Sequence, residues 1–169
     1  MIPKDFKLQN VTWEKEPASR PVTDSDFVEL TEATTIQIQS SRKTKGGRDV
    51  HIEEFRLPAG VLTNGGSIPR PLWTVGGITP LTPRDQMAFF NHDGMFMVIA
   101  YCRMNRLKSP ISFDEANQIL GKSLKENKIR SWLVYEGVSL FGKAHCRTLT
   151  PDEMRSAKKI MEINGFLNR

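Results

Sequence analysis

Residues 36 to 53 read Ile36-Gln37-Ile38-Gln39-Ser40-Ser41-Arg42-Lys43-Thr44-Lys45-Gly46-Gly47-Arg48-Asp49-Val50-His51-Ile52-Glu53. Apolar and polar residues alternate on both sides of the Gly-Gly pair, and a period of two is typical of β-strands. Glycine supplies the backbone freedom that a tight turn requires. The stretch therefore predicts an antiparallel hairpin that turns near Gly46-Gly47, within a strand-like region running from Phe27 to Leu57.

Basic residues surround the predicted turn, namely Arg42, Lys43, Lys45 and Arg48. They are the one local concentration of basic residues in a chain whose net charge is +5 and whose other basic residues are spread along the sequence. A solvated hairpin tip explains this concentration as well as a phosphate-binding site does. Nucleic acid is therefore a less favoured partner.

Helix signals dominate the second half of the chain. Thr82 followed by Pro83 predicts a helix start, because proline suits the first helical position and threonine can cap it. Two capping boxes, Ser112 to Glu115 and Thr150 to Glu153, predict two more starts. Gly142 and Gly165 follow apolar-periodic stretches and predict helix ends. We expect four or so helices.

The region between Pro58 and Pro83 is rich in glycine and proline and has little periodicity, which predicts a long ordered loop. The fold class expected is α+β: a small antiparallel sheet in the N-terminal half, this loop, then helices packed on the sheet. We expect a single domain over residues 1–169, with a C-terminal helix at about 151–164.

Composition supports a chain that folds alone, since 38% of its residues are hydrophobic and 25% are charged. The N-terminal residues lack the apolar region of a signal peptide, so the two cysteines are not expected to form a disulfide framework. The longest apolar-rich run, Met95 to Tyr101, is too short to span a membrane. We expect a soluble protein of cytosolic type.

Three clusters could carry chemistry. The loop Thr63 to Arg70 offers the polar side chains Asn64, Ser67 and Arg70, but it lacks the spacing and lysine of a phosphate loop and the elbow of an esterase. Asn91-His92-Asp93 is expected at the end of an apolar helix. His92 and Asp93 could bind a divalent metal, although adjacent helical residues do not share a face.

The structural alternative for this second cluster is a core hydrogen bond from His92 and local pairing of Asp93. The third cluster, Asp114 to Asn117, opens a helix, and capping explains its carboxylates. His51, His145, Cys102 and Cys146 form no recognisable ligand spacing, so a zinc finger is not expected.

Three separated blocks resemble a known family. They are Pro58 to Arg70, His92-Asp93, and Ala116-Asn117-Gln118-Ile119-Leu120. Together they resemble the tailed-phage and prophage family catalogued as domain of unknown function 1353, over about residues 50–142. The resemblance implies a viral origin and a shared fold, with Asn64, Ser67, Arg70, His92, Asp93 and Asn117 converging as one polar cluster. No activity is established for that family.

The family's pattern has aspartate at the positions of Asn64 and Asn117, whereas Ser67, Arg70, His92 and Asp93 match it. An amide neither neutralises a divalent ion nor acts as a general base. The two replacements therefore favour a structural role over a metal hydrolase, and neither a metal nor a cofactor is expected.

Three functions follow as hypotheses. The leading one is a non-catalytic phage protein, a minor virion or tail-associated structural component on a degenerate hydrolase-like scaffold. Its partners would be other phage structural proteins, and it would occur in the host cytoplasm during infection and in the virion. The second is a metal-dependent hydrolase of cell wall or nucleotide that uses His92 and Asp93, with Ser67 and Arg70 holding substrate. The third is a host-interaction or counter-defence protein. The oligomeric state is left open.

Overall fold

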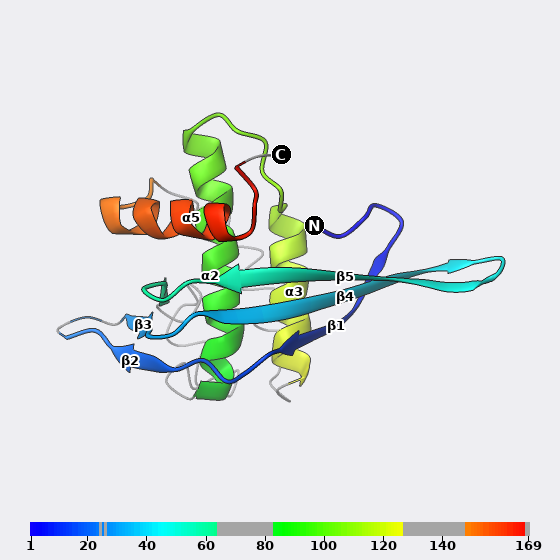
Figure 1. Cartoon of the computed structure of the whole chain (residues 1–169), viewed down its shortest axis with the longest axis horizontal. Helices are drawn as coiled ribbons and strands as arrows, with labels where there is room; N and C mark the ends of the chain where they lie inside the picture. The colour runs from blue at the N-terminus through cyan, green and yellow to red at the C-terminus, as the bar shows by residue number, and fades with distance from the viewer. Residues whose placement is uncertain (24, 26, 64–82, 127–147, 168–169) are drawn as a thin grey trace.

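A computed structural model describes residues 1–23, 25, 27–63, 83–126 and 148–167. Its strands precede its helices along the chain, so the α+β class is confirmed (Figure 1). Three helices lie in the described part, against four or so expected. The expected helix that ends at Gly142 falls outside the described residues.

The larger sheet contains β1 (Lys7–Trp13), β4 (Thr34–Thr44) and β5 (Gly47–Leu57) in the order β1-β4-β5. Both pairings are antiparallel, and β4 and β5 pair from Thr34–Leu57 to Thr44–Gly47. The predicted hairpin is thus confirmed. Gly47 has φ +136°, a conformation that glycine adopts and other residues avoid.

A second three-stranded sheet, which the sequence did not indicate, contains β2 (Ser19–Pro21), β3 (Val28–Leu30) and β6 (Leu62–Thr63) in the order β2-β3-β6. Strand β6 occupies part of the stretch expected to be loop. Its two residues pair with Val28 and Glu29 of β3, which explains why no period is visible in so short a strand.

The helices are α2 (Pro83–Met104), α3 (Phe113–Glu126) and α5 (Pro151–Ile163). All three described starts lie where the caps predict them. Backbone N–H groups and side chains of Ser112 and Glu115 form one capping box, and those of Thr150 and Glu153 form the other. Helix α5 ends before Gly165, whose φ of +66° is left-handed.

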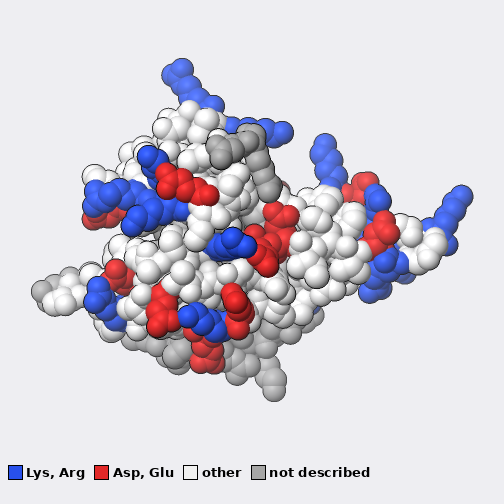
Figure 2. All heavy atoms as spheres, in the orientation of Figure 1, with Lys and Arg blue, Asp and Glu red and all other residues white. Residues whose placement is uncertain are grey.

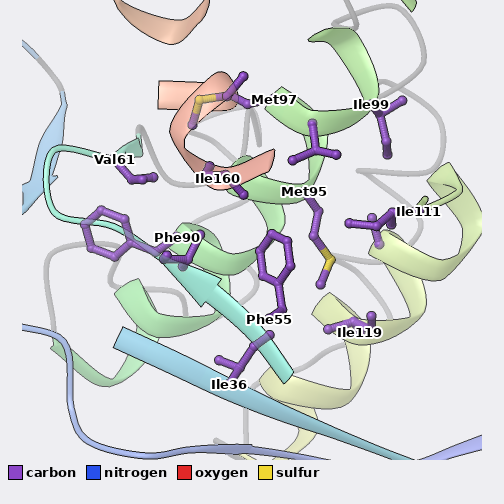
Figure 3. Packing of buried hydrophobic residues seen from close by; sticks show 14 of the residues in the cluster. Ile36, Phe55, Val61, Phe90, Met95, Met97, Ile99, Ile111, Ile119 and Ile160 are labelled. Atoms are coloured by element: carbon purple, nitrogen blue, oxygen red, sulfur yellow. The ribbon is translucent and has the colours of Figure 1, made fainter. Parts of the chain in front are cut away.

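Helices α2 and α3 lie side by side behind the larger sheet, and α5 crosses α2 near the end of β5 (Figure 1). The core fills the space between these layers, with Ile36 and Phe55 from the sheet and Met95, Ile119 and Ile160 from the helices (Figure 3). All five side chains are buried, so the apolar periodicity of each element turns toward one shared core.

Gly94 sets how closely α2 approaches the sheet. A Cβ at this position would lie 2.6 Å from Cδ2 of Leu57, a distance that side-chain carbons do not adopt. Helix α2 continues past Gly94 to Met104, and the glycine permits close packing there.

The period of β5 was predicted correctly, but its outer half presents its apolar residues to solvent. Register with β4 places Glu53 opposite Ile38 and Ile52 opposite Gln39. Val50 and Ile52 are consequently on the face opposite Ile38, with 53% and 59% of their surface exposed. The hairpin extends beyond the helices as an arm, residues 42–52, in which every residue except the half-buried His51 is exposed (Figure 1).

Within the part of the chain that the structure describes, no helix combines the length and apolar character needed to cross a bilayer.

Candidate functional site

His92 and Asn117 connect the two central helices. The imidazole Nε2 of His92 in α2 lies 3.1 Å from the amide Oδ1 of Asn117 in α3, and both residues are buried. Because an amide oxygen only accepts, Nε2 carries the hydrogen and donates it. Nδ1 of the neutral ring is then left as an acceptor.

The carboxylate of Asp93 lies beside the ring of His92, but its hydrogen bond is with Thr63 and not with the ring. Its Oδ1 is 3.5 Å from Nδ1 of His92, whereas its Oδ2 accepts a 2.6 Å hydrogen bond from Oγ1 of Thr63. Nδ1 has no hydrogen-bond partner among the described residues. In the neutral tautomer two acceptors face each other across this gap, so the carboxylate does not orient the ring as it does in a catalytic triad.

Thr63 was not singled out from the sequence as a site residue. It is the last residue of β6 and is buried against α2. Its bond to Asp93 fixes the point where the chain enters the 64–70 block. Asn64, Ser67 and Arg70 themselves lie outside the described residues.

A second polar contact, also missed, lies seven residues earlier on α2. The hydroxyl of Ser19 in β2 donates to Oε1 of buried Gln86 across 2.5 Å. Gln86 and Asp93 share a face of the helix, since seven residues make two turns. The signal available in the sequence was a polar pair at this spacing within an apolar helix.

The ring of His92 is covered by Phe96, which packs in turn against Phe113. Phe96, one turn further along α2, lies 4.0 Å from the imidazole between centroids, and the edge of Phe113 meets Phe96 at 5.2 Å. His92 is 1% exposed as a result. The imidazole is therefore shielded from solvent as well as hydrogen-bonded.

Asn91 is the third member of the predicted cluster and is completely buried. Its amide oxygen and nitrogen have no hydrogen-bond partner within the described residues. Asn91, His92 and Asp93 lie in the middle of α2, not at a helix end as expected, so they project in different directions.

Metal ligation would rest on very few side chains. Within the described residues no group of three or more His, Cys, Asp or Glu lies close enough to hold an ion. His51 pairs with Glu53 on β5, and His145 and Cys146 lie outside the described residues.

The remaining cysteine, Cys102, is buried with its Sγ 4.0 Å from Sδ of Met161. Burial raises the pKa of its thiol, against the smaller effect of Ser109. A buried thiol with a raised pKa is a poor nucleophile, which agrees with a packing role.

Comparison with known proteins gave no match among family models, curated proteins or solved structures. The resemblance to the phage family therefore remains a prediction.

Proposed function

We propose that this chain is a non-catalytic phage protein, a minor structural component of the virion or its tail machinery. The absence of catalysis is supported by one observation: the polar side chains of α2 are engaged in hydrogen bonds to neighbouring elements of the fold. Gln86, His92 and Asp93 bind β2, α3 and β6 respectively. Each of the three joins α2 to a different element.

A general base needs a ring nitrogen that reaches the substrate. In His92 the hydrogen of Nε2 is donated to Asn117, and Phe96 covers the ring. An aspartate at position 117, as in the resembling family, would instead accept that hydrogen as an anion and could stabilise a charged imidazole. The amide accepts the hydrogen without carrying a charge, which favours a structural role for the histidine.

Location in the particle rests on the phage resemblance and on the shape of the molecule. The arm extends well beyond the helices and carries Lys and Arg at its tip (Figures 1 and 2). An extended arm of this kind is suited to docking in a larger assembly, where backbone edges and charges can be matched by neighbours.

Quantitative mass spectrometry of gradient-purified particles of the phage that encodes the chain tests this proposal. The expected result is a fixed copy number relative to the major capsid protein. Absence from particles, with abundance early in infection, would overturn the virion role and favour host interaction.

A metal-dependent hydrolase is the second candidate. One contact favours it, the 3.5 Å approach of Asp93 Oδ1 to Nδ1 of His92, because Asp93 remains 16% exposed. Near-stoichiometric metal that survives dialysis of the purified protein would place this candidate first.

A further inference from the structure

Strand β5 has one edge without a strand partner in the described part of the chain, because it is the last in the order β1-β4-β5. Arg56 shows which residues of β5 point their backbone N–H and C=O groups toward this edge. Its N–H donates to Oδ1 of Asn164 at 2.8 Å, and its C=O accepts from Nδ2 of the same side chain at 2.9 Å. The amide of Asn164 thus pairs with the edge as another strand would.

Backbone groups alternate in direction along a strand. Since Arg56 points its N–H and C=O away from β4, residues 54, 52, 50 and 48 do the same. No hydrogen bond from these backbone groups is made within the described residues. Among the described residues the protected part of the edge therefore stops at Arg56, and the outward backbone groups of the arm have no partner there.

The same four residues share the outer face of the sheet. Their order is Arg48, Val50, Ile52 and Glu54, a cation, two exposed apolar side chains and an anion. Proteins usually protect such edges with inward charges, proline or a covering loop. An edge with two exposed β-branched side chains indicates a partner strand.

We propose that β5 pairs antiparallel with β5 of a second copy of this chain, about a two-fold axis that passes His51. In this register Arg48 lies opposite Glu54 of the other copy, and Val50 lies opposite Ile52. Both pairs occur twice by symmetry. All four residues point their backbone groups outward, so the opposed residues are hydrogen-bonded pairs, and the two larger sheets become one.

Neighbouring registers match poorly. An axis at Ile52 would place Arg48 opposite Arg56 and Val50 opposite Glu54. An axis at Val50 would place Arg48 opposite Ile52. On the other face, the proposed register puts Asp49 opposite Glu53, but each has a partner in its own chain, Arg42 at 3.0 Å and His51 at 3.1 Å. Glu54 also has a partner in its own chain, Arg56 at 2.9 Å. Of the three axes compared, only the one at His51 places opposite charges across from each other on the outer face.

The tip of the second arm also has a place to lie. A depression of about 250 Å³ beside β5 is lined by Ile52, Glu53, Glu54, Arg56, Ile163 and Asn164. The register brings Gly46 and Gly47 toward Arg56 and Phe55, but Asn164 already bonds the N–H and C=O of Arg56, so the strand pairing ends at the Arg48–Glu54 pair and the turn bends away from Asn164. Figure 2 shows basic residues at the tip of the arm, with some acidic residues along the arm as well.

Sedimentation equilibrium of the full chain tests the pairing, and this test does not depend on whether the chain is in a virion. We expect a dimer that dissociates on dilution. Arg48→Glu and Glu54→Arg should each weaken it roughly tenfold, and the double variant should restore it to within about threefold, because the charges are exchanged but still opposed. Lys108→Glu, in the exposed turn after α2, is the matched charge control and should have no effect.

A monomer at about 1 mM would overturn the inference, as would a dimer that ignores both charge reversals. The register itself is tested by oxidation in a Cys146→Ser background. His51→Cys should form an intermolecular disulfide, since its two copies face each other with Cα atoms about 4.5 Å apart. Val50→Cys should not, because its copies are diagonal neighbours about 8 Å apart. The opposite result would contradict the axis at His51.

Discussion

Nε2 of His92 donates to Oδ1 of Asn117 across 3.1 Å and so joins the middle of α2 to the first turns of α3 inside the core. A bond between two buried polar groups matters most when one partner is removed, because the other then loses both water and protein partners. The stability of variants at these two positions therefore tests whether the cluster has a structural or a chemical role.

His92→Phe and Asn117→Leu should each lower the free energy of unfolding by about 1–3 kcal/mol, because each leaves one buried polar group unpaired. The double variant should recover part of that loss, since it removes both groups together. Urea unfolding followed by circular dichroism measures all four proteins. An increase in stability for His92→Phe would indicate instead a residue retained for function at the expense of stability.

The hydroxyl of Thr63 should stabilise the smaller sheet, β2-β3-β6, more than the rest of the fold. Thr63→Val keeps the shape but removes the donor to Asp93, so β6 and β3 should exchange amide hydrogens faster while the larger sheet is unaffected. Hydrogen exchange resolved by peptide measures this. Thr63→Ser keeps the hydroxyl and should behave as wild type. Equal acceleration in both sheets would show that the bond is not local.

The sequence predicted those features that local chemistry determines. Both described capping boxes and the hairpin turn depend on residues that are neighbours in the chain, so their spacing is visible in the sequence. The role of Gly94 depends on Leu57, which is far away in sequence. Strand β6 and the bonds of Thr63 and Gln86 likewise depend on contacts between distant segments, for which the sequence holds no periodic signal.

The candidate site shows the same division. His92 and Asp93 could be selected by residue type, but their position in the middle of a helix could not be seen from the residues around them. The exposure of Val50 and Ile52 was hidden for a similar reason. Alternation gives the period of a strand, and only the register with β4 says which set faces the core.

Gly94→Ala should destabilise the protein, although alanine is favoured over glycine inside helices by about 1 kcal/mol. The new methyl group would lie 2.6 Å from Leu57 and would push α2 away from β5. In a Leu57→Ala background the same substitution should be neutral or stabilising, because the obstructing carbon is gone. Thermal unfolding of the four proteins measures the change of sign. A stabilising Gly94→Ala in the wild-type background would contradict the close contact.

Glu115 should make stability depend on pH in acid. Burial alone would raise the pKa of its carboxyl, but hydrogen bonds from the backbone N–H groups of Ser112 and Ile2 outweigh burial and hold the pKa below its ordinary value. A group whose pKa is lower in the folded state stabilises the fold above its unfolded pKa, and that contribution disappears as the pH falls through the folded pKa.

Wild type should therefore be more stable than Glu115→Gln at neutral pH, and the two should converge as the pH falls below the ordinary glutamate pKa. Denaturant unfolding at a series of pH values measures the difference. Asp114→Asn, an exposed change in the same helical turn, is the control. A difference that persists unchanged in strong acid would show that the charge of Glu115 is not involved.

Added divalent metal should leave the thermal stability of the wild-type protein unchanged. Among the described residues the ligands within reach are the Nδ1 atom of His92 and the carboxylate of Asp93, and the second carboxylate oxygen already accepts from Thr63. An ion that binds only the folded state and is present at a hundred times its dissociation constant would raise the free energy of unfolding by about 2.7 kcal/mol. A thermal unfolding experiment detects a change of that size easily. Zn²⁺, Mn²⁺ and Mg²⁺ should each be tried against a chelator-treated sample.

The matched comparison is the variant Asn64→Asp/Asn117→Asp, which restores both carboxylates of the resembling family's pattern. Metal stabilisation of this variant alone would indicate that the two amides removed an ion site, and stabilisation of the wild type would favour the hydrolase over the structural protein.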